Sequence, residues 1–416
     1  MPRSPSSPAF WRSPLRGPWF TSVLGIVLLG GITVLFLTGL VSYAAYNPNL
    51  SPVNDMTPDK GLLGFYLFSW PTDPPWLYRL TQGIHVTLGI TLIPVLLAKL
   101  WSVVPKLFTL PPARSLAHAL ERISLLLLVG GALFEFVTGV LNVQLDYIFP
   151  GSFYPLHFYG AWVFIAAFVA HAVLRVPMAV RNLRHLRDED LTDGERELVS
   201  PDPAPPTVSR RGALGFVGGG SLLLFATTAG HSFDAPIRET AVLAPHGGPE
   251  PGSGPGGFQI NKTAASRGIN ATETSAEAWR LVVEGGGRTV RLSRADLLQL
   301  TLYSAALPIA CVEGWSTSDQ WWRGVRLRDL AALVGYEGDE EDTAPDVLVE
   351  SLQRHGAFRR AALRYNQVRD PRSLLALFVN GEDLTPDHGY PARIIVPAAP
   401  GVLNTKWVAR MTFGDL

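Results

Sequence analysis

Histidine and cysteine side chains are the residues of this sequence whose types and positions best suit metal chemistry. The candidates are three histidines inside long apolar stretches, one histidine at the start of such a stretch and the single cysteine of the chain: His85, His157, His171, His118 and Cys311. Imidazole nitrogen and thiolate sulfur are strong transition-metal donors. Polar side chains are costly inside a bilayer, so histidines there are candidates for a function.

His157 and His171 lie in one expected helix, fourteen residues apart. Fourteen steps of about 100° end about 40° short of four full turns, and the rise is about 21 Å. Both imidazoles therefore leave one face near opposite membrane surfaces, as axial ligands of two stacked haems would. Each haem needs a second ligand at matching depth. We expect His85 to pair with His157 at the outer haem and His118 with His171 at the inner haem; the alternative for any one of them is a hydrogen-bonded packing residue.

Glu135 places a carboxylate near the middle of the third apolar stretch. It could accept a proton during quinol oxidation, because removing electrons from a quinol also releases its protons. The alternative, which we favour, is a residue paired with another helix or facing a water-filled gap.

Five apolar stretches are long enough to cross a bilayer core of about 30 Å at 1.5 Å per residue. They are residues 21–41, 80–104, 119–145, 156–174 and 212–230. Arginine and lysine gather before the first stretch, between the second and third, and between the fourth and fifth, whereas the other loops are acidic. Positive loops favour the cytoplasmic side. We therefore expect a multi-pass protein of the cell membrane with a cytoplasmic N-terminus and an extracytoplasmic C-terminal region, in contact with membrane lipid.

The overall balance of 35 basic and 35 acidic residues gives no indication of nucleic-acid binding. We divide the chain into a cytoplasmic tail (1–19), a four-helix membrane domain (20–180), a basic loop (181–211), a fifth helix (212–230), a linker rich in proline and glycine (231–257) and an extracytoplasmic domain (258–416). Arg210 and Arg211, ahead of a weakly apolar stretch, suggest an internal twin-arginine export signal. The alternative is ordinary positive charge beside a membrane helix.

Short strand-like runs separated by turns follow the linker, at 279–284, 289–292, 347–351, 374–379 and 393–396, with helices at 293–299 and 327–333. This order predicts a mixed α+β domain. Cys311 falls in an apolar stretch at 307–316 that we also expect to be strand-like. An unpaired thiol in an oxidising compartment favours metal ligation or catalysis, and the alternative is a small buried hydrophobic residue.

Several ordered motifs in this region resemble the sulfite-oxidase-type molybdopterin domain. They are LSRADL at 292–297, CVEGWS at 311–316, WRGVRLRDL at 322–330, DHGYPARIIVP at 387–397 and NTKWV at 404–408. The resemblance covers residues 258–413. Within the family, the CVEGWS context is closer to the periplasmic methionine-sulfoxide reductase catalytic subunits than to sulfite oxidases, so sulfite is not the expected substrate.

The resemblance implies that Cys311 binds molybdenum beside the two sulfurs of the pterin dithiolene. It implies cationic and backbone donors for the phosphate of the pterin, supplied by Arg393 and Lys406. Other residues in matching segments are expected to contact the cofactor: Asn261, Ser351, His388, Asn404 and Thr405.

The membrane half resembles the cytochrome b subunits of formate dehydrogenases and nickel–iron hydrogenases, which also carry two histidines fourteen apart. Here the first helix has no histidine, unlike that family. The fold class expected is thus a four-helix cytochrome b core with a fifth anchor helix, followed by the α+β molybdopterin domain. The expected function is a molybdopterin-dependent oxidoreductase that exchanges electrons with quinone or quinol through two b-type haems and reduces an oxidised substrate, small or protein-bound, such as a sulfoxide. The alternatives are a non-enzymatic haem conduit with a molybdenum-free docking domain, and a molybdenum domain on a haem-free anchor.

Overall fold

The computed structural model describes most of the chain and divides it into two compact units. Described are residues 4–7, 10–50, 53–54, 57–58, 63–108, 115–143, 153–184, 202–233, 237–244, 258–260, 262–337 and 344–416, without the side chains of Ala117, His118 and Glu121. Unit 1 comprises Met1–Leu37, Thr87–Asn142 and Leu156–Thr227, and unit 2 comprises Thr38–Val86, Val143–Pro155 and Thr228–Leu416.

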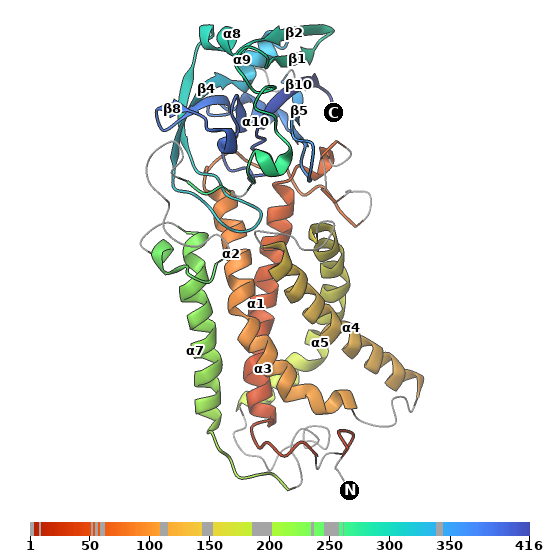
Figure 1. Cartoon of the computed structure of the whole chain (residues 1–416). Coiled ribbons are helices and arrows are strands. Elements are labelled where there is room, and N and C mark those ends of the chain that lie inside the picture. Colours follow the sequence, from red (N-terminus) through yellow and green to blue (C-terminus); the bar gives the residue numbers. More distant parts are fainter. Residues whose placement is uncertain are drawn as a thin grey trace. The chain divides into compact units, whose positions relative to one another are not determined.

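Long apolar helices make up unit 1 and lead into unit 2 (Figure 1). Their bounds are α1 Pro18–Ala44, α2 Leu77–Thr91, α3 Ile93–Val103, α4 Leu116–Asn142, α5 Tyr154–Arg184 and α7 Arg210–Thr228. Among the described residues, four helical segments are long and apolar enough to span a membrane, and α2 with the helical residues after it forms a fifth candidate. The expectation of several apolar helices before a mixed domain is confirmed.

The second apolar stretch differs from the single helix expected over residues 80–104. Its two parts, Leu77–Thr91 and Ile93–Phe108, meet at a bend of 41°. Pro94 stands at the first turn of α3, where proline is tolerated because the amides of a first turn have no intrahelical acceptor. The proline therefore starts a new helix rather than continuing the old one.

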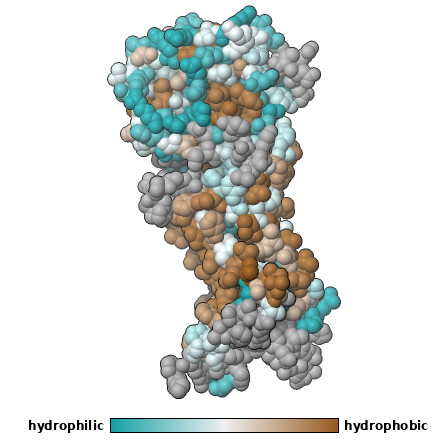
Figure 2. Space-filling view, turned by 90° about the vertical axis from the view of Figure 1, so that its right-hand side faces the viewer, coloured by the Kyte–Doolittle hydropathy of each residue, from teal (hydrophilic) through white to brown (hydrophobic). Residues whose placement is uncertain are grey.

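Large apolar side chains on these helices are exposed. Val173, Leu174 and Phe216 are 69–75% exposed, and the most apolar windows of the spanning helices are only 11–17% buried. Figure 2 shows hydrophobic residues gathered over the helices and hydrophilic ones over the C-terminal domain. Apolar patches of this extent are rare on monomeric soluble proteins. The helices are therefore compatible with a membrane-anchored protein.

One mixed sheet and one antiparallel sheet form the C-terminal part of unit 2 (Figure 1). The first has the order β2-β1-β10-β5-β6, with β1 parallel to β10; the second has the order β3-β4-β7-β8, and β9 pairs with β7. The strands are β1 Leu281–Gly285, β2 Arg288–Leu292, β3 Tyr303–Leu307, β4 Gln320–Arg326, β5 Asp346–Ser351, β6 Arg360–Leu363, β7 Leu374–Val379, β8 Glu382–Asp383, β9 Arg393–Ile395 and β10 Val408–Gly414. Short helices α8 Arg294–Gln299, α9 Leu327–Ala332 and α10 Tyr365–Arg369 lie between them.

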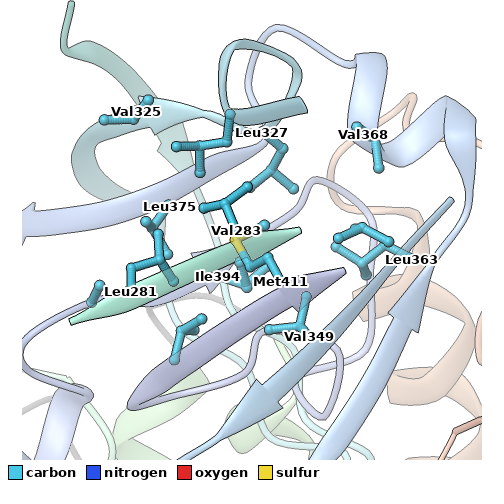
Figure 3. Packing of buried hydrophobic residues seen from close by; sticks show 14 of the residues in the cluster. Leu281, Val283, Val325, Leu327, Val349, Leu363, Val368, Leu375, Ile394 and Met411 are labelled. Carbon is cyan, nitrogen blue, oxygen red and sulfur yellow. The ribbon is translucent and has the colours of Figure 1, made fainter. Parts of the chain in front are cut away.

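Aliphatic side chains from both sheets and from the short helices form the main core of this domain. Figure 3 shows Val283, Met411 and Val349 from neighbouring strands meeting Leu327 and Leu375. All five are completely buried. Helix α8 starts at a capping box, in which the Ser293 and Asp296 side chains satisfy each other's backbone amides.

The segment between α1 and α2 also belongs to unit 2, and we call residues 45–76 the strap. Trp70, 1% exposed, donates its indole N–H to the carbonyl of Ala398 at 2.7 Å. The buried Asn47 amide donates to Ala362 O at 3.0 Å and to Gln367 Oε1 at 2.8 Å. Buried amides need such partners. The strap is therefore part of the C-terminal domain, which chain order alone does not reveal.

Candidate active site

Cys311 lies in a tight loop between β3 and β4, not in the strand expected over residues 307–316. Strand β3 ends at Leu307, and only an isolated bridge joins Ala310 to Ser316. The Cys311 amide donates to Trp315 O at 2.8 Å, and the Gly314 amide donates to Cys311 O at 3.0 Å. Gly314 has φ +91°, a conformation that favours glycine. The glycine turn folds the apolar stretch back on itself.

The thiol of Cys311 is buried beside a carboxylate. It is 4% exposed, and its Sγ donates to Glu313 Oε2 at 3.5 Å. The same oxygen accepts the Trp315 indole N–H at 2.9 Å, which fixes the carboxylate. Burial, and then the charge of Glu313, raise the pKa of the Cys311 thiol well above its ordinary value. A buried thiolate at this position therefore needs a cation beside it, such as a bound metal.

Helix α2 packs against this loop within unit 2. Gln82 Nε2 donates to Val312 O at 2.5 Å. A Cβ on Gly314 would lie 2.8 Å from the Val86 side chain. The position of the Cys311 loop therefore depends on the middle turns of α2.

Arg393 and Lys406 are held in one buried network of backbone carbonyls. Arg393, 2% exposed, donates to His388 O at 3.0 Å and to Asn404 O at 3.3 Å. Lys406 Nζ donates to Lys262 O at 3.0 Å and to Asp387 O at 2.7 Å. Except for Lys262, which precedes β1, these residues come from β9 and from the turns on either side of it, so the fold brings together the two C-terminal motifs.

These cations keep hydrogen-bonding capacity for an anion. In the part of the chain described, neither Arg393, Lys406 nor Lys262 forms an ion pair with a carboxylate, and the buried Nε of Arg393 has no partner. Burial lowers the pKa of Arg393 to about 9 and that of Lys406 well below its ordinary value. The charge of Arg393 lowers the pKa of Lys406 further. Burying several like charges is costly unless an anion compensates them, so the phosphate of a pterin fits this cluster.

Four other residues predicted to contact the cofactor lie in or beside the same network. Asn404 Oδ1 accepts the Val396 amide at 2.9 Å, and Ser351 Oγ donates to Lys406 O at 2.7 Å. His388 Nε2 donates to Phe258 O at 3.3 Å. The hydroxyl of Thr405 is buried and, among the described residues, has no partner. Asn261 lies outside the described residues.

Two polar residues at the site were not among those predicted. Lys262 follows Asn261 directly and interacts electrostatically with Cys311, which lowers the pKa of the thiol against the effect of burial. Glu313 is 7% exposed and bonded to the thiol. Glu313 could have been predicted from the sequence, because a carboxylate two residues after a cysteine in an apolar stretch is unusual. Lys262 could not, because its proximity to Cys311 depends on the fold.

The described residues contain no cluster of three or more histidine, cysteine, aspartate or glutamate side chains suited to a metal ion. Cys311 is the single thiolate donor of the described residues, and the Glu313 carboxylate lies beside it. A single thiolate fits a metal whose other sulfurs come from a pterin, since the remaining donors then belong to the cofactor.

The predicted haem ligands lie in both units, and the rings of two of them have polar contacts within their own unit. In unit 2, His85 Nδ1 lies 3.2 Å from Thr38 Oγ1. In unit 1, His157 Nδ1 lies 2.9 Å from Thr138 Oγ1 and 3.1 Å from Glu135 Oε2. Glu135 is thus paired with another helix, as we favoured. His171 lies on α5 with His157, and the His118 side chain lies outside the described residues.

Comparison with known proteins identifies the C-terminal domain. Residues 268–415 match the family model described as "Oxidoreductase molybdopterin binding domain". Mitochondrial sulfite oxidase from Homo sapiens is 31% identical over 160 residues, which cover 33% of this chain and 29% of that protein. The uncharacterized oxidoreductase YuiH from Bacillus subtilis is 32% identical over 136 residues, covering 32% of this chain and 65% of that protein.

A nitrate reductase from Hordeum vulgare is 37% identical over 98 residues, covering 22% of this chain and 10% of that protein. The match with the human sulfite oxidase spans less than a third of its length. Residues 268–415 are therefore a molybdopterin-binding oxidoreductase domain of the sulfite oxidase type.

Proposed function

We propose that this chain passes electrons between the quinone pool and an extracytoplasmic molybdenum site through two b-type haems and reduces a sulfoxide-like or other oxo substrate. The observation that carries the proposal is the buried Cys311 thiol beside Lys262 and Lys406, in a domain that follows a set of exposed apolar helices. When bound, molybdenum supplies oxygen-atom transfer coupled to a two-electron change.

The chain's own residues contribute positioning and charge. Cys311 supplies the soft anionic sulfur, and its loop is closed by the Trp315 carbonyl and by α2. Arg393 and Lys406 would hold the phosphate of the pterin, because neither forms an ion pair with a carboxylate among the described residues and Arg393 Nε has no partner there. The aromatic residues Phe258, Trp315 and Trp322 are nearly completely buried in the same apolar cluster as Cys311, which keeps water away from the thiol.

The composition of unit 2 supports the proposed topology. It joins Thr38–Val86, which includes the end of α1 and most of α2, with Val143–Pro155 and Thr228–Leu416. The parts of this unit that lie outside the helices are expected on one side of a membrane, which requires an even number of crossings between them. With α2 and α3 as one crossing, there are two crossings from the first segment to the second and two more, α5 and α7, to the third.

The haems would be held by His85 with His157 and by His118 with His171, as the spacing of the histidines along their helices suggests. The hydrogen bonds to Nδ1 of His85 and His157 support this role. Metal-binding histidines usually hydrogen-bond through their second ring nitrogen, which fixes the orientation of the ring.

Elemental analysis and a reduced-minus-oxidised spectrum of the purified full-length protein test the proposal. We expect molybdenum, pterin and a b-type haem spectrum in one preparation. Haem without molybdenum would instead indicate a non-enzymatic electron conduit, and molybdenum without a haem spectrum would indicate an anchored enzyme served by another electron carrier. Either result would contradict the proposal.

The Cys311→Ser variant tests the metal ligand. Serine is a harder donor that cannot replace a thiolate on this metal, so we expect turnover to fall at least about 100-fold, the loss typical of removing a catalytic group. The haem spectrum should not change. Asp319→Asn, an exposed change in the same loop, is the matched control and should keep full activity. Normal turnover of Cys311→Ser would rule out the ligand role.

A further inference from the structure

The rings of His85 and His157 lie in different units, but each has a threonine and a glycine as immediate neighbours. Thr38 Oγ1 on α1 lies 3.2 Å from His85 Nδ1, and Thr138 Oγ1 on α4 lies 2.9 Å from His157 Nδ1. In both cases a helix threonine contacts the same nitrogen of a histidine on the following long helix. The repetition indicates a shared way of orienting an imidazole.

A glycine follows each of these threonines, and a side chain added there would meet the same ring atom. A Cβ on Gly39 would lie 3.1 Å from His85 Cε1, and one on Gly139 would lie 3.4 Å from His157 Cε1. The glycines therefore let each ring lie close to the neighbouring helix backbone. The repeat is visible in the sequence as FLTG at 36–39 and FVTG at 136–139.

The hydrogen bonds of Thr138 fix which nitrogen of His157 carries the proton. Thr138 Oγ1 donates its hydrogen to the carbonyl of Phe134 at 2.7 Å. A hydroxyl has one hydrogen, so towards His157 the oxygen can only accept. Nδ1 therefore carries the ring proton, and Nε2 is the nitrogen with a lone pair for a metal.

Glu135 adds a negative charge to the same nitrogen. Its Oε2 lies 3.1 Å from His157 Nδ1, and a Cβ on Gly160 of α5 would overlap its Oε1. The glycine therefore makes room for the carboxylate. A carboxylate that accepts the Nδ1 proton makes the imidazole a stronger donor, which stabilises a metal in its higher oxidation state.

We propose that Thr38 and Thr138 are equivalent positioning residues for two axial haem ligands, and that Glu135 lowers the reduction potential of the haem bound by His157. This inference rests on the proposed haem function. Each Thr-Gly pair then orients one imidazole, and Glu135 sets the reduction potential of one haem iron.

Redox titration of the haem absorbance in the full-length, detergent-purified protein tests the inference. Glu135→Gln keeps the shape of the side chain and removes its charge, so we expect a higher midpoint potential for one haem only. Thr138→Val and Thr38→Val should lower haem occupancy or broaden the haem absorbance, whereas Thr138→Ser, which keeps the hydroxyl, should behave as the wild type. Thr33→Val on α1 is the control, because Thr33 is exposed and its hydroxyl bonds to Leu29 O.

The outcomes separate the inference from the proposed function. A wild-type protein without haem would overturn both. A wild-type protein with two b-type haems whose potentials do not change in Glu135→Gln would overturn the role of Glu135 alone. If Thr138→Ser and Thr138→Val have the same effect, the hydroxyl does not position the ligand and the assignment of the threonines is wrong.

Discussion

At the scale of single residues, the site is a place where positive charge is buried before any cofactor compensates it. His388 lies beside Arg393 and Lys406, is 1% exposed, and donates Nε2–H to Phe258 O. Burial, and then the charges of Arg393 and Lys406, lower the pKa of His388 to about 4. The imidazole is therefore neutral in the folded domain at neutral pH.

The pH dependence of stability should report this neutral histidine. Between about pH 6.5 and 4 the unfolded chain binds a proton at His388 that the folded domain does not, so the free energy of unfolding should decrease as the pH falls through this window. The full effect is about 3 kcal/mol. Denaturant unfolding of the cofactor-free full-length protein, followed by tryptophan fluorescence, should show a shallower pH slope for His388→Gln. His355→Gln, at an exposed histidine, should keep the wild-type slope; equal slopes for all three proteins would contradict the assignment.

At the scale of elements, α2 and the Cys311 loop meet at a glycine. Gly314 combines a positive φ with a close approach to Val86, so a side chain there is opposed both by the backbone conformation and by the neighbouring helix. Gly381 has the same φ of +91°, but a Cβ there would meet no atom within 4 Å. Comparing Gly314 with Gly381 therefore separates the effect of the backbone conformation from the effect of the contact with Val86.

Alanine at these two glycines should have different effects. Gly381→Ala should lower the free energy of unfolding by about 1–2 kcal/mol, the cost of a left-handed residue with a side chain. Gly314→Ala should cost about 1–3 kcal/mol more, because the methyl group also overpacks against Val86. Thermal unfolding of the two variants in detergent measures the difference. An equal loss in both would show that the loop and α2 are not tightly packed.

At the scale of the whole molecule, the C-terminal domain includes the strap from the beginning of the chain. Trp70, Asn47 and Asn54 are almost completely buried, and each hydrogen-bonds with the C-terminal domain. Arg372 adds an ion pair with Asp73 at 2.8 Å, which is partly exposed and therefore contributes little. The tryptophan and the two asparagines hold the strap in place.

Trp70→Ala should destabilise unit 2 by about 3–5 kcal/mol, because it removes a large buried side chain and leaves Ala398 O without its donor. We expect faster cleavage of the strap by a soluble protease acting on the full-length protein. Trp76→Ala is the matched control, since Trp76 is 46% exposed, and its effect should stay within about 0.5 kcal/mol. Equal cleavage rates in both variants would show that the strap is not anchored at Trp70.

Local sequence patterns predicted much of the fold. Strand β7 has the expected bounds, and β1, β2, β5, β9, α8 and α9 differ from the expected ranges by one or two residues. Strands β3, β4, β6, β8 and β10 were not predicted. Strand β10 lies between β1 and β5, and its parallel pairing with β1 joins residues about 128 apart, such as Val282 and Arg410. Pairings of this kind depend on tertiary contacts that a local pattern does not contain.

The candidate site was likewise predictable where local motifs mark it and not where it depends on tertiary contacts. The motifs around Cys311, Arg393 and Lys406 could be located from the sequence, because each combines a reactive or charged residue with characteristic neighbours. The turn that carries Cys311 was expected as a strand, since its apolar residues mask the effect of Gly314. The Thr138 contact with His157 was not predicted, because it depends on how two helices pack.

The strap also has a consequence for the timing of biosynthesis. Asn47 and Gln367, which form a buried hydrogen bond, are 320 residues apart. At roughly 5–20 residues per second, ribosomes take about 15–60 s to make the chain between them. During that interval Asn47 and Trp70 have no partner to bind. The strap is therefore one of the first segments of the chain to be made and one of the last to join the domain that carries Cys311.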